Sequence, residues 1–518
     1  MGRRSLSILI VGMGLQMLCV KIATAQAEIP SLNLSLSLSL NNVVDLAITQ
    51  STSIKYVQNR NVRSYWRWKN FKTGFMPQLI LTGDLPNFSH TTQPITQPDG
   101  SIEFKNVANA QMYANLALTQ SIAATGTQIY AASSVYRIED YNTDNIEYSG
   151  TPISVGFVQP IFSYNRMRWQ KQVEPLMYEE SMRSFIESIE QISLSATYRF
   201  FRFLRVQTNL SLARSNLKNS NDNLRIAETR RTLGTISEND FSRIRLSVIN
   251  AQKALNQSKM DMKNADFELK SYVQLDPDQD LQLEMPLNIF LFDIDVEKAR
   301  REAQTNRKET PSYERRLIEA DRDLVRAKRD NSLRATLRGS YGMSNNSSTV
   351  GGIYQQPDQQ QMIRLSLSVP ILDWGRSESK VKLAESQREL VVYDVENDRM
   401  NFDRGIIVQV EQFSLLKDQL TTAKEADNVA ENGYEISLRR FQNGEISIMD
   451  LNISLQEREK ARRDYISSLQ DYWVAYYRLR ILTLYDFETQ EKIWYPNPML
   501  DIPEKDRMAI ENFRQVPN

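Results

Sequence analysis

Two ten-residue segments decide the fold: ISVGFVQPIF at residues 153–162 and IRLSLSVPIL at residues 363–372. They align without a gap at an offset of 210 residues. The same offset relates the pattern Arg-x-x-x-Gly-x-Ile-Ser-x-x-Asp at 230–240 to its copy at 440–450. Because two separated motifs agree at one offset, the sequence predicts an internal duplication in which each half builds the same structural unit.

Between these landmarks the sequence predicts long helices. Residues 167–232 and 377–442 contain no proline except Pro175. Small or apolar residues recur three and four apart, which is the spacing of a heptad seam. In the first copy these seam residues are Leu210, Ala213, Leu217, Leu224 and Ala227. Each segment is long enough for a helix of roughly 60 residues, on the order of 90 Å.

The chain is predicted to reverse after each long helix. Gly234 and Gly444 stand at the two reversals, and glycine readily adopts the positive φ that a tight turn between helices requires. Ser237 and Ser447 follow as N-caps of a returning helix. Each half therefore holds an antiparallel helical hairpin whose tip is the glycine turn.

The N-terminus predicts export. Two arginines precede an apolar run over residues 6–20, and small residues at 23–25 fit a signal-peptidase site. Residues 1–25 are therefore predicted as a signal peptide. Cys19 leaves lipidation open, although Leu18 stands where a lipoprotein signal has a small residue. No later stretch is apolar and long enough for a helical membrane span.

Charge and composition exclude several kinds of site. Lysine plus arginine and aspartate plus glutamate both number 63, and His90 and Cys19 are the only residues of their types. Without net positive charge no nucleic-acid partner is expected. Without His or Cys clusters no zinc or iron–sulfur site is expected, and we expect no metal or cofactor. No GxSxG, HExxH, P-loop or GxGxxG motif occurs, so no enzymatic activity is expected. His90 is expected in an exposed loop.

Several segments show the period of a β-strand. Residues 153–157 and 363–368 alternate between apolar and small or polar side chains. Residues 46–75 and 299–332 are predicted as helices, and each leads into another alternating segment. In an exported chain without helical spans, such strands fit an outer-membrane barrel. Two strand pairs per chain are too few to close a barrel, so several copies must share one.

Two further motifs carry a resemblance to a known family. Residues 369–376 read Val-Pro-Ile-Leu-Asp-Trp-Gly-Arg, and residues 159–166 hold a weaker copy, Gln-Pro-Ile-Phe-Ser-Tyr-Asn-Arg. Together with the duplicated hairpin turns, they resemble the outer-membrane efflux protein family, the TolC-like outer-membrane factors, over residues 40–488. The resemblance implies a mixed α and β membrane protein. This would be a homotrimer whose single transmembrane β-barrel continues into a long periplasmic α-helical barrel.

The resemblance also implies a function and partners. The chain would be the exit duct of a tripartite efflux or secretion pump in the outer membrane of a Gram-negative-type envelope. A periplasmic adaptor (membrane fusion protein), an inner-membrane transporter and outer-membrane lipid would be its partners. Residues 26–290 would form the first repeat, 291–488 the second and 489–518 a C-terminal tail. The exported substrate and the class of transporter are not indicated.

A different class of protein is the alternative. A coiled-coil tether or adhesin of the cell envelope, without transport activity, would also have long heptad seams. It would not need strand pairs that return the chain twice to the same helical layer. The strand pairs therefore favour the duct.

The hairpin tips carry the first set of candidate functional residues. Asp240 and Asp450 are assigned to the periplasmic entrance and gate, and Asp450 matches an aspartate that lines the entrance in the family. The alternative for both is a solvated aspartate in a first helical turn, which is favourable beside the helix dipole. Ile453 stands where the family has its next entrance aspartate. The resemblance assigns six tip residues to contact with the adaptor: Arg230, Gly234, Ser237, Arg440, Gly444 and Ser447.

The strand-to-helix turns carry the second set. It contains Pro160, Arg166, Pro370, Gly375 and Arg376. Asp373 and Trp374 belong to the same turns. We interpret them as a turn and a membrane-interface anchor rather than as a substrate site.

The first half carries an insertion that the second half lacks. Residues 83–150 join strands that the second half joins through residues 339–362. Within the insertion, residues 113–122 and 128–138 alternate in strand fashion around a turn at 123–126. One interpretation is a hairpin that turns at the periplasmic rim, giving six barrel strands per chain and about 18 in a trimer. The other is an extracellular hairpin above or inside the barrel.

Overall fold

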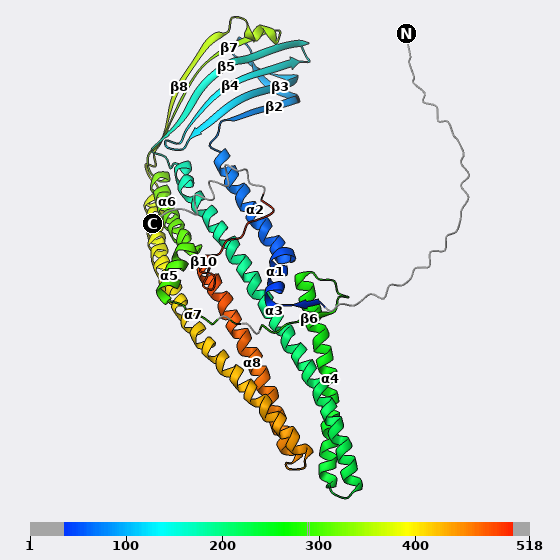
Figure 1. The fold of residues 1–518 in the computed structure, drawn as a ribbon. Helices are drawn as coiled ribbons and strands as arrows, with labels where there is room; N and C mark the ends of the chain where they lie inside the picture. Colours follow the sequence, from blue (N-terminus) through cyan, green and yellow to red (C-terminus); the bar gives the residue numbers. More distant parts are fainter. Residues whose placement is uncertain (1–35, 287–288, 290, 501–518) are drawn as a thin grey trace, which may run out of the picture.

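The computed structural model describes residues 36–286, 289 and 291–500. A curved β-sheet forms one end of the molecule, and two long helical hairpins extend from it (Figure 1). The predicted signal peptide with Cys19, and the tail beyond residue 500, lie outside the described residues.

The two hairpins have equal helix lengths. Helix α3 (Arg166–Thr232) and helix α7 (Arg376–Gln442) each contain 67 residues, and α4 (Glu238–Val273) and α8 (Ile448–Thr483) each contain 36. At 1.5 Å per residue the longer helices span about 100 Å. The predicted bounds of α3 and α7 are confirmed within one residue, and α3 continues through Pro175.

The shorter predicted helices are each divided into two. Helices α1 (Leu40–Gln50) and α2 (Thr52–Thr73) replace the single helix predicted for residues 46–75. Helices α5 (Val296–Asn306) and α6 (Glu309–Asp330) replace the one predicted for residues 299–332. The chain leaves helical geometry at Ser51 and at Arg307, where ψ is 154° and 151°. The hydroxyl of Ser51 then accepts a hydrogen bond from the N–H of Ile54 and caps α2.

The main sheet has six antiparallel strands in the order β2-β3-β4-β5-β7-β8. Their bounds are β2 (Gln78–Thr96), β3 (Ile102–Ile122), β4 (Thr127–Asp140), β5 (Asn145–Ile161), β7 (Arg334–Ser347) and β8 (Asp358–Ser368). The insertion in the first half supplies β3 and β4, which lie inside the sheet order rather than apart from it. His90 lies in β2 opposite Ala108. The loop predicted for it is therefore wrong, although the side chain is exposed.

The strand register sorts the side chains onto two faces, because directly paired residues of an antiparallel sheet share a face. One face, here called the apolar face, carries the pairs Leu79–Leu118, Ile129–Phe157 and Leu337–Leu365. The opposite face, here called the polar face, carries Thr82–Asn115, Ala132–Ser154 and Thr336–Ser366. Most large side chains of the apolar face are exposed in the single chain. The sheet thus presents an uncovered hydrophobic surface on one side.

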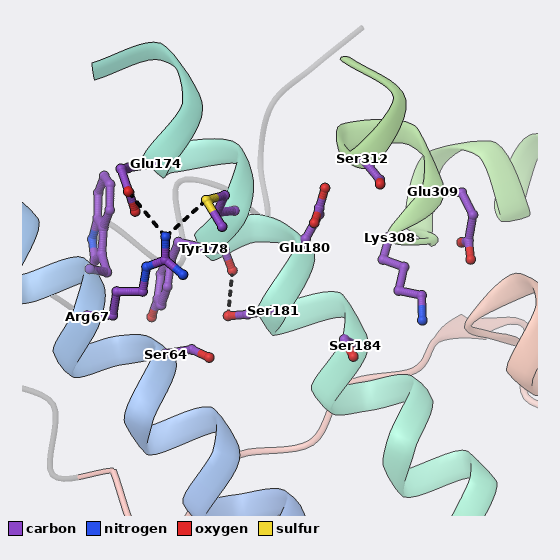
Figure 2. A pocket seen from close by; sticks show the side chains of 12 residues that line it. Ser64, Arg67, Glu174, Tyr178, Glu180, Ser181, Ser184, Lys308, Glu309 and Ser312 are labelled. Carbon is purple, nitrogen blue, oxygen red and sulfur yellow. Dashed lines mark hydrogen bonds and ion pairs between the residues drawn. The ribbon is translucent and has the colours of Figure 1, made fainter. Parts of the chain in front are cut away.

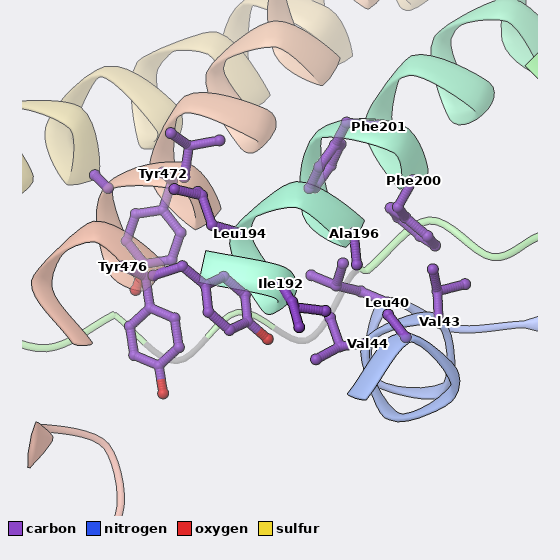
Figure 3. Packing of buried hydrophobic residues seen from close by; sticks show 14 of the residues in the cluster. Leu40, Val43, Val44, Ile192, Leu194, Ala196, Phe200, Phe201, Tyr472 and Tyr476 are labelled. Carbon is purple, nitrogen blue, oxygen red and sulfur yellow. The ribbon is translucent and has the colours of Figure 1, made fainter. Parts of the chain in front are cut away.

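The hydrophobic core lies where the hairpins meet the short helices. Phe200 and Phe201 of α3 are fully buried, and Leu40 and Val43 of α1 pack toward them (Figure 3). On the other side of α3, Tyr472 of α8 is 2% exposed. Burying each large apolar side chain contributes about 1.5–3 kcal/mol, so this region anchors the two halves to each other.

Short elements complete this central region. Strand β1 (Leu36–Leu38) pairs in parallel with β6 (Leu281–Leu283), and β9 (Tyr485–Asp486) pairs with β10 (Glu491–Lys492). The 3₁₀-helix η1 (Gly351–Tyr354) lies in the connection between β7 and β8, and its Ile353 side chain lies beside Gly150 of β5. Across the part of the chain that the structure describes, none of the helices has the length and hydropathy of a bilayer span.

Candidate functional site: the hairpin tips and the strand-to-helix junctions

The two hairpin tips share one turn geometry. Gly234 has φ +68° and Gly444 has φ +81°, in the left-handed region that favours glycine. In the first turn the N–H of Gly234 donates to the carbonyl of Arg231 at 3.0 Å. In the second, the N–H of Gly444 donates to the carbonyl of Phe441 at 2.9 Å. The positive φ predicted at both glycines is confirmed.

The returning helices begin with serine caps, as predicted. The N–H of Asp240 donates to the hydroxyl of Ser237 at 3.1 Å, and that hydroxyl donates to the Asp240 carboxylate at 2.6 Å. At the second tip, the N–H and hydroxyl of Ser447 both donate to Oδ2 of Asp450, at 3.1 and 2.7 Å. Both aspartates are therefore held against their own helix starts, and Ser447 with Asp450 forms a capping box.

This capping has an electrostatic consequence for Asp450. Hydrogen bonds from the side chain and backbone of Ser447 hold the pKa of the exposed Asp450 carboxyl below its usual 3.8. The carboxylate is thus kept charged at the start of α8, where the helix dipole also favours a negative group. An aspartate in the first turn of a helix, the alternative to a gate residue, accounts for these contacts. Their assignment to a gate depends on how several copies assemble.

The first and second tips contact each other through an arginine and an aromatic ring. The guanidinium of Arg230 lies 6.0 Å from the ring centroid of Phe441, within cation–π distance. Its Nη2 would lie 3.7 Å from a Cβ added at Gly444. Arg440 instead pairs with Glu445 of its own turn, N to O at 3.3 Å. Of the predicted tip residues, the structure therefore brings Arg230 and Gly444 together.

Polar contacts join the two hairpins above the tips. The amide of Asn219 on α3 donates to the hydroxyl of Tyr434 on α7 at 2.9 Å. Asn216 on α3 donates to the carboxylate of Glu459 on α8. The sequence did not predict these two hydrogen bonds, because the residues that they join are more than 200 positions apart.

A buried acidic residue lies between α7 and α8. Asp427 is 4% exposed, and its Oδ1 lies 3.1 Å from Nε of Arg462. Burial raises the pKa of the Asp427 carboxyl above 3.8, and the nearby Arg462 opposes this shift. A signal existed in the sequence, since the 210-residue offset places this aspartate on the seam position held by Leu217 in the first half.

The strand-to-helix junctions differ between the halves. Gly375 has φ +83° and precedes α7, which begins at Arg376. Asp373 closes this turn, because its carboxylate accepts hydrogen bonds from the N–H groups of Gly375 and Ser377 at 3.2 and 2.9 Å. Pro370 lies between the end of β8 and the turn. These residues form the predicted turn.

The first junction corrects one prediction. Pro160 lies inside β5, opposite Thr336, and not in the turn. It lies beyond Val158, the last β5 residue paired with β4, where the sheet has a neighbour on one side only. A proline without an N–H is tolerated at such a position. The turn itself comes later, and α3 starts at Arg166 after the N-cap Asn165.

Exposed apolar residues surround the second junction. Ile371 and Trp374 are 94% and 91% exposed, and Trp374 has a positive φ of 56°. Tryptophan is enriched where proteins cross the membrane–water interface. This geometry fits the interface anchor predicted for the motif.

The inserted hairpin turns at the helical end of the sheet. The side-chain amide of Asn165, the N-cap of α3, donates to the carbonyl of Ala123 at 2.8 Å and of Ala124 at 3.3 Å. Gly126 of the same turn lies against the Asn165 side chain. The turn between β3 and β4 is therefore packed on the start of α3, at the opposite end of the strands from the turn at Gly100.

A hollow of about 410 Å³ lies between α2, α3 and α6 (Figure 2). Several of its polar groups already have partners: Nη2 of Arg67 lies 3.3 Å from Oε1 of Glu174, and the Ser181 hydroxyl donates to the Tyr178 carbonyl at 2.9 Å. No group of three or more metal-ligating side chains occurs among the described residues. We interpret the hollow as a packing gap between helices.

The described chain thus combines a six-stranded sheet that has two open edges with two long helical hairpins. Residues 314–483 match the model of the outer membrane efflux protein family, so the resemblance seen in the sequence is confirmed over this part of the chain. The chain is also 20% identical over 400 residues to toxin and drug export protein A of Aggregatibacter actinomycetemcomitans, covering 74% of this chain and 78% of that protein.

Solved structures show the same fold. The Campylobacter jejuni CmeC outer membrane channel aligns with a TM-score of 0.61 at 14% identity, over 92% of this chain and 89% of that one. The outer membrane protein VceC of Vibrio cholerae aligns with a TM-score of 0.59 at 14% identity, over 86% and 95%. The chain therefore has the mixed α and β fold of outer-membrane efflux channels.

Proposed function

We propose that the protein is the outer-membrane exit duct of a tripartite efflux or secretion pump and works as a homotrimer. Its sheets would form one β-barrel in the outer membrane, and its helical hairpins would form a tube through the periplasm. Substrates would pass from an inner-membrane transporter through this duct to the outside. The name of the curated relative suggests drugs or toxins as the class of cargo.

The open edges of the sheet carry this proposal. Strand β2 has 19 residues and β8 has 11, and each pairs with one neighbour only. The apolar face beside them is exposed in the single chain. In lipid, unpaired backbone groups at such edges cost several kcal/mol each, so a sheet must close on itself. Pairing of β8 with β2 of the next copy satisfies both edges at once.

The number of strands supports a wide barrel. Three copies of a six-stranded sheet supply about 18 strands, and barrel diameter grows with strand number. The contact between Asn165 and the β3–β4 turn supports the version in which the inserted hairpin crosses the membrane and turns at the periplasmic rim. The Trp374 side chain is suited to the same rim.

The hairpin tips would form the periplasmic entrance and the docking surface of the adaptor. Asp240 and Asp450 would line the entrance, and the adaptor would contact the two glycine turns and their flanking residues. These residues are Arg230, Gly234, Ser237, Arg440, Gly444 and Ser447. The exposed turns at the far end of each hairpin support this assignment.

The direct test uses purified protein in mild detergent. Light scattering should give the mass of three chains after subtraction of bound detergent, and the trimer should conduct ions in planar bilayers. A monomer, or a trimer that never conducts, would refute the duct and favour a tether.

A further inference from the structure

Three arginines gather on the polar face of β7 and β8. Arg338 on β7 is the direct cross-strand partner of Arg364 on β8. Arg334 lies on the same face of β7, about 13 Å along the strand toward the helices. All three side chains are exposed. We call them the arginine belt.

Within the described chain, the belt has no acidic partner. None of its guanidinium groups forms an ion pair or a side-chain hydrogen bond with another described residue, whereas Arg137 of the apolar face pairs with Glu139 at 2.8 Å. Directly paired side chains lie about 5 Å apart, and like charges there destabilise a sheet. The two positive charges of Arg338 and Arg364 therefore repel each other, and an anion bound between them would remove this repulsion.

The position of the belt places it on the water-filled side of a closed barrel. Its strand neighbours on the same face are polar: Thr336, Ser340, Ser366 and Ser368. The opposite face carries Leu337, Leu365 and Leu367, which suit lipid. Because the belt lies at the helical end of the strands, it would encircle the inner end of the barrel, where the tube opens into it.

Acidic residues of the polar face lie elsewhere. Asp84, on the open edge strand β2, is opposite Tyr113, and Asp358 lies at the far end of β8. Asp140 and Glu147 are on the same face at the far ends of β4 and β5. Counting Asp84 against the belt leaves a surplus of positive charge at the inner end of each copy. Toward the far ends of the strands, Glu103 pairs with Lys105 at 3.1 Å.

We propose that the arginine belt attracts anionic groups and raises the permeability of the duct to anions. This inference rests on the proposed duct function and specifies the charge of the groups that the inner end of the barrel binds. Guanidinium groups bind carboxylates and phosphates in a bidentate manner, so solutes carrying those groups fit the belt. Rings of arginine are a recognised basis of anion selectivity in pores. No such role requires a conformational change of the sheet.

The test is the reversal potential of single trimers in planar bilayers between about 0.1 M and about 0.01 M KCl. At these concentrations the Debye length is about 10 Å and about 30 Å, so wall charges act across much of a wide pore on the dilute side. Because Asp240 and Asp450 of the proposed entrance also act on the permeating ions, the effect of the belt is measured as the difference between each variant and the wild type. The double substitution R338Q/R364Q should lower the chloride-to-potassium permeability ratio by about twofold or more.

Two further variants keep the test decisive. The substitution Asp84→Asn removes a carboxylate from the same face and should raise the chloride preference, which remains measurable if the arginine variant fails to insert. Lys105→Gln, on the polar face but far from the belt, should leave the reversal potential unchanged. Equal chloride-to-potassium permeability ratios in wild type, R338Q/R364Q and D84N would overturn the belt while leaving the duct intact. Absence of conductance would instead refute the duct.

Discussion

Arg480 on α8 holds Glu190 on α3 through two parallel hydrogen bonds, from Nε to Oε2 at 2.8 Å and from Nη2 to Oε1 at 2.9 Å. Glu190 is fully buried, and the hydroxyl of Tyr495 donates to it at 2.6 Å. Burial alone would lower the pKa of Arg480, but the hydrogen bonds and charge of Glu190 raise it, so the arginine stays charged. The pair joins the two halves and the segment after α8 at one point.

The substitution Glu190→Gln should destabilise the helical region strongly. The substitution removes the carboxylate charge from the two hydrogen bonds, while Arg480 keeps Asp486 as a second carboxylate partner. Loss of a hydrogen bond to a charged group costs about 1.5–3 kcal/mol. The change should appear as a lower midpoint when helix loss is followed by circular dichroism in detergent. A matched control is Glu268→Gln, whose partner Arg202 is 56% exposed, and which should cost less than about 1 kcal/mol. Equal midpoints for the two variants would contradict this account.

The buried pair also marks the limit of what the sequence predicts. The helical hairpins follow from local chemistry: the seam spacing, the glycines at positive φ and the serine caps at Ser237 and Ser447 lie within a few residues of the features they determine. The contact of Glu190 with Arg480 joins residues 290 positions apart, and no local pattern indicates it. The helix breaks at Ser51 and Arg307 were missed for a related reason, because the periodicity continues through them.

The inserted hairpin predicts a specific pattern of chemical labelling. A cysteine at Thr125, in the β3–β4 turn, should be inaccessible to an impermeant thiol reagent added to intact cells, because the turn packs on Asn165 at the helical end. It should react once the outer membrane is permeabilised, since Thr125 is exposed. A cysteine at Asp99, in the turn between β2 and β3, should react from outside in intact cells.

These two sites are matched, because both are exposed turn residues and the natural Cys19 lies in the predicted signal peptide. Labelling of Thr125→Cys from outside intact cells would eliminate the version with six membrane-crossing strands. Failure of Asp99→Cys to react would mean that the far end of the sheet is covered. Mass spectrometry of the labelled protein measures both outcomes.

Asp427 predicts a pH dependence with a definite sign. Its pKa in the folded protein is raised above 3.8 by burial, so the folded state binds this proton more readily than the unfolded state. Its contribution to stability is full below pH 3.8 and is lost as the pH rises through the folded pKa. The thermal midpoint of the wild type relative to Asp427→Asn should therefore be higher at about pH 4 than at about pH 7.

Asp450 supplies the control of opposite sign. Its pKa is lowered by Ser447, so its contribution is present above pH 3.8 and is lost only as the pH falls through a still lower value. The midpoint difference between the wild type and Asp450→Asn should therefore not rise between about pH 7 and about pH 4, and it should fall on further acidification. A wild-type midpoint that falls relative to Asp427→Asn on acidification would show that burial does not control this carboxyl.

The second tip gives a prediction that separates export from membrane insertion. Gly444 has φ +81° and donates its N–H to the Phe441 carbonyl, whereas proline fixes φ near −65° and has no N–H. Gly444→Pro should therefore disrupt the tip and abolish export, measured as loss of resistance to an exported compound. The strands are far from this turn, so the amount of trimer in the outer membrane should not change.

Gly405→Ala is the control within the same helix, because nothing lies within 4 Å of the added Cβ. It should keep export and stabilise α7 by about 1 kcal/mol. Normal export by the proline variant would exclude the tip turn from the transport function.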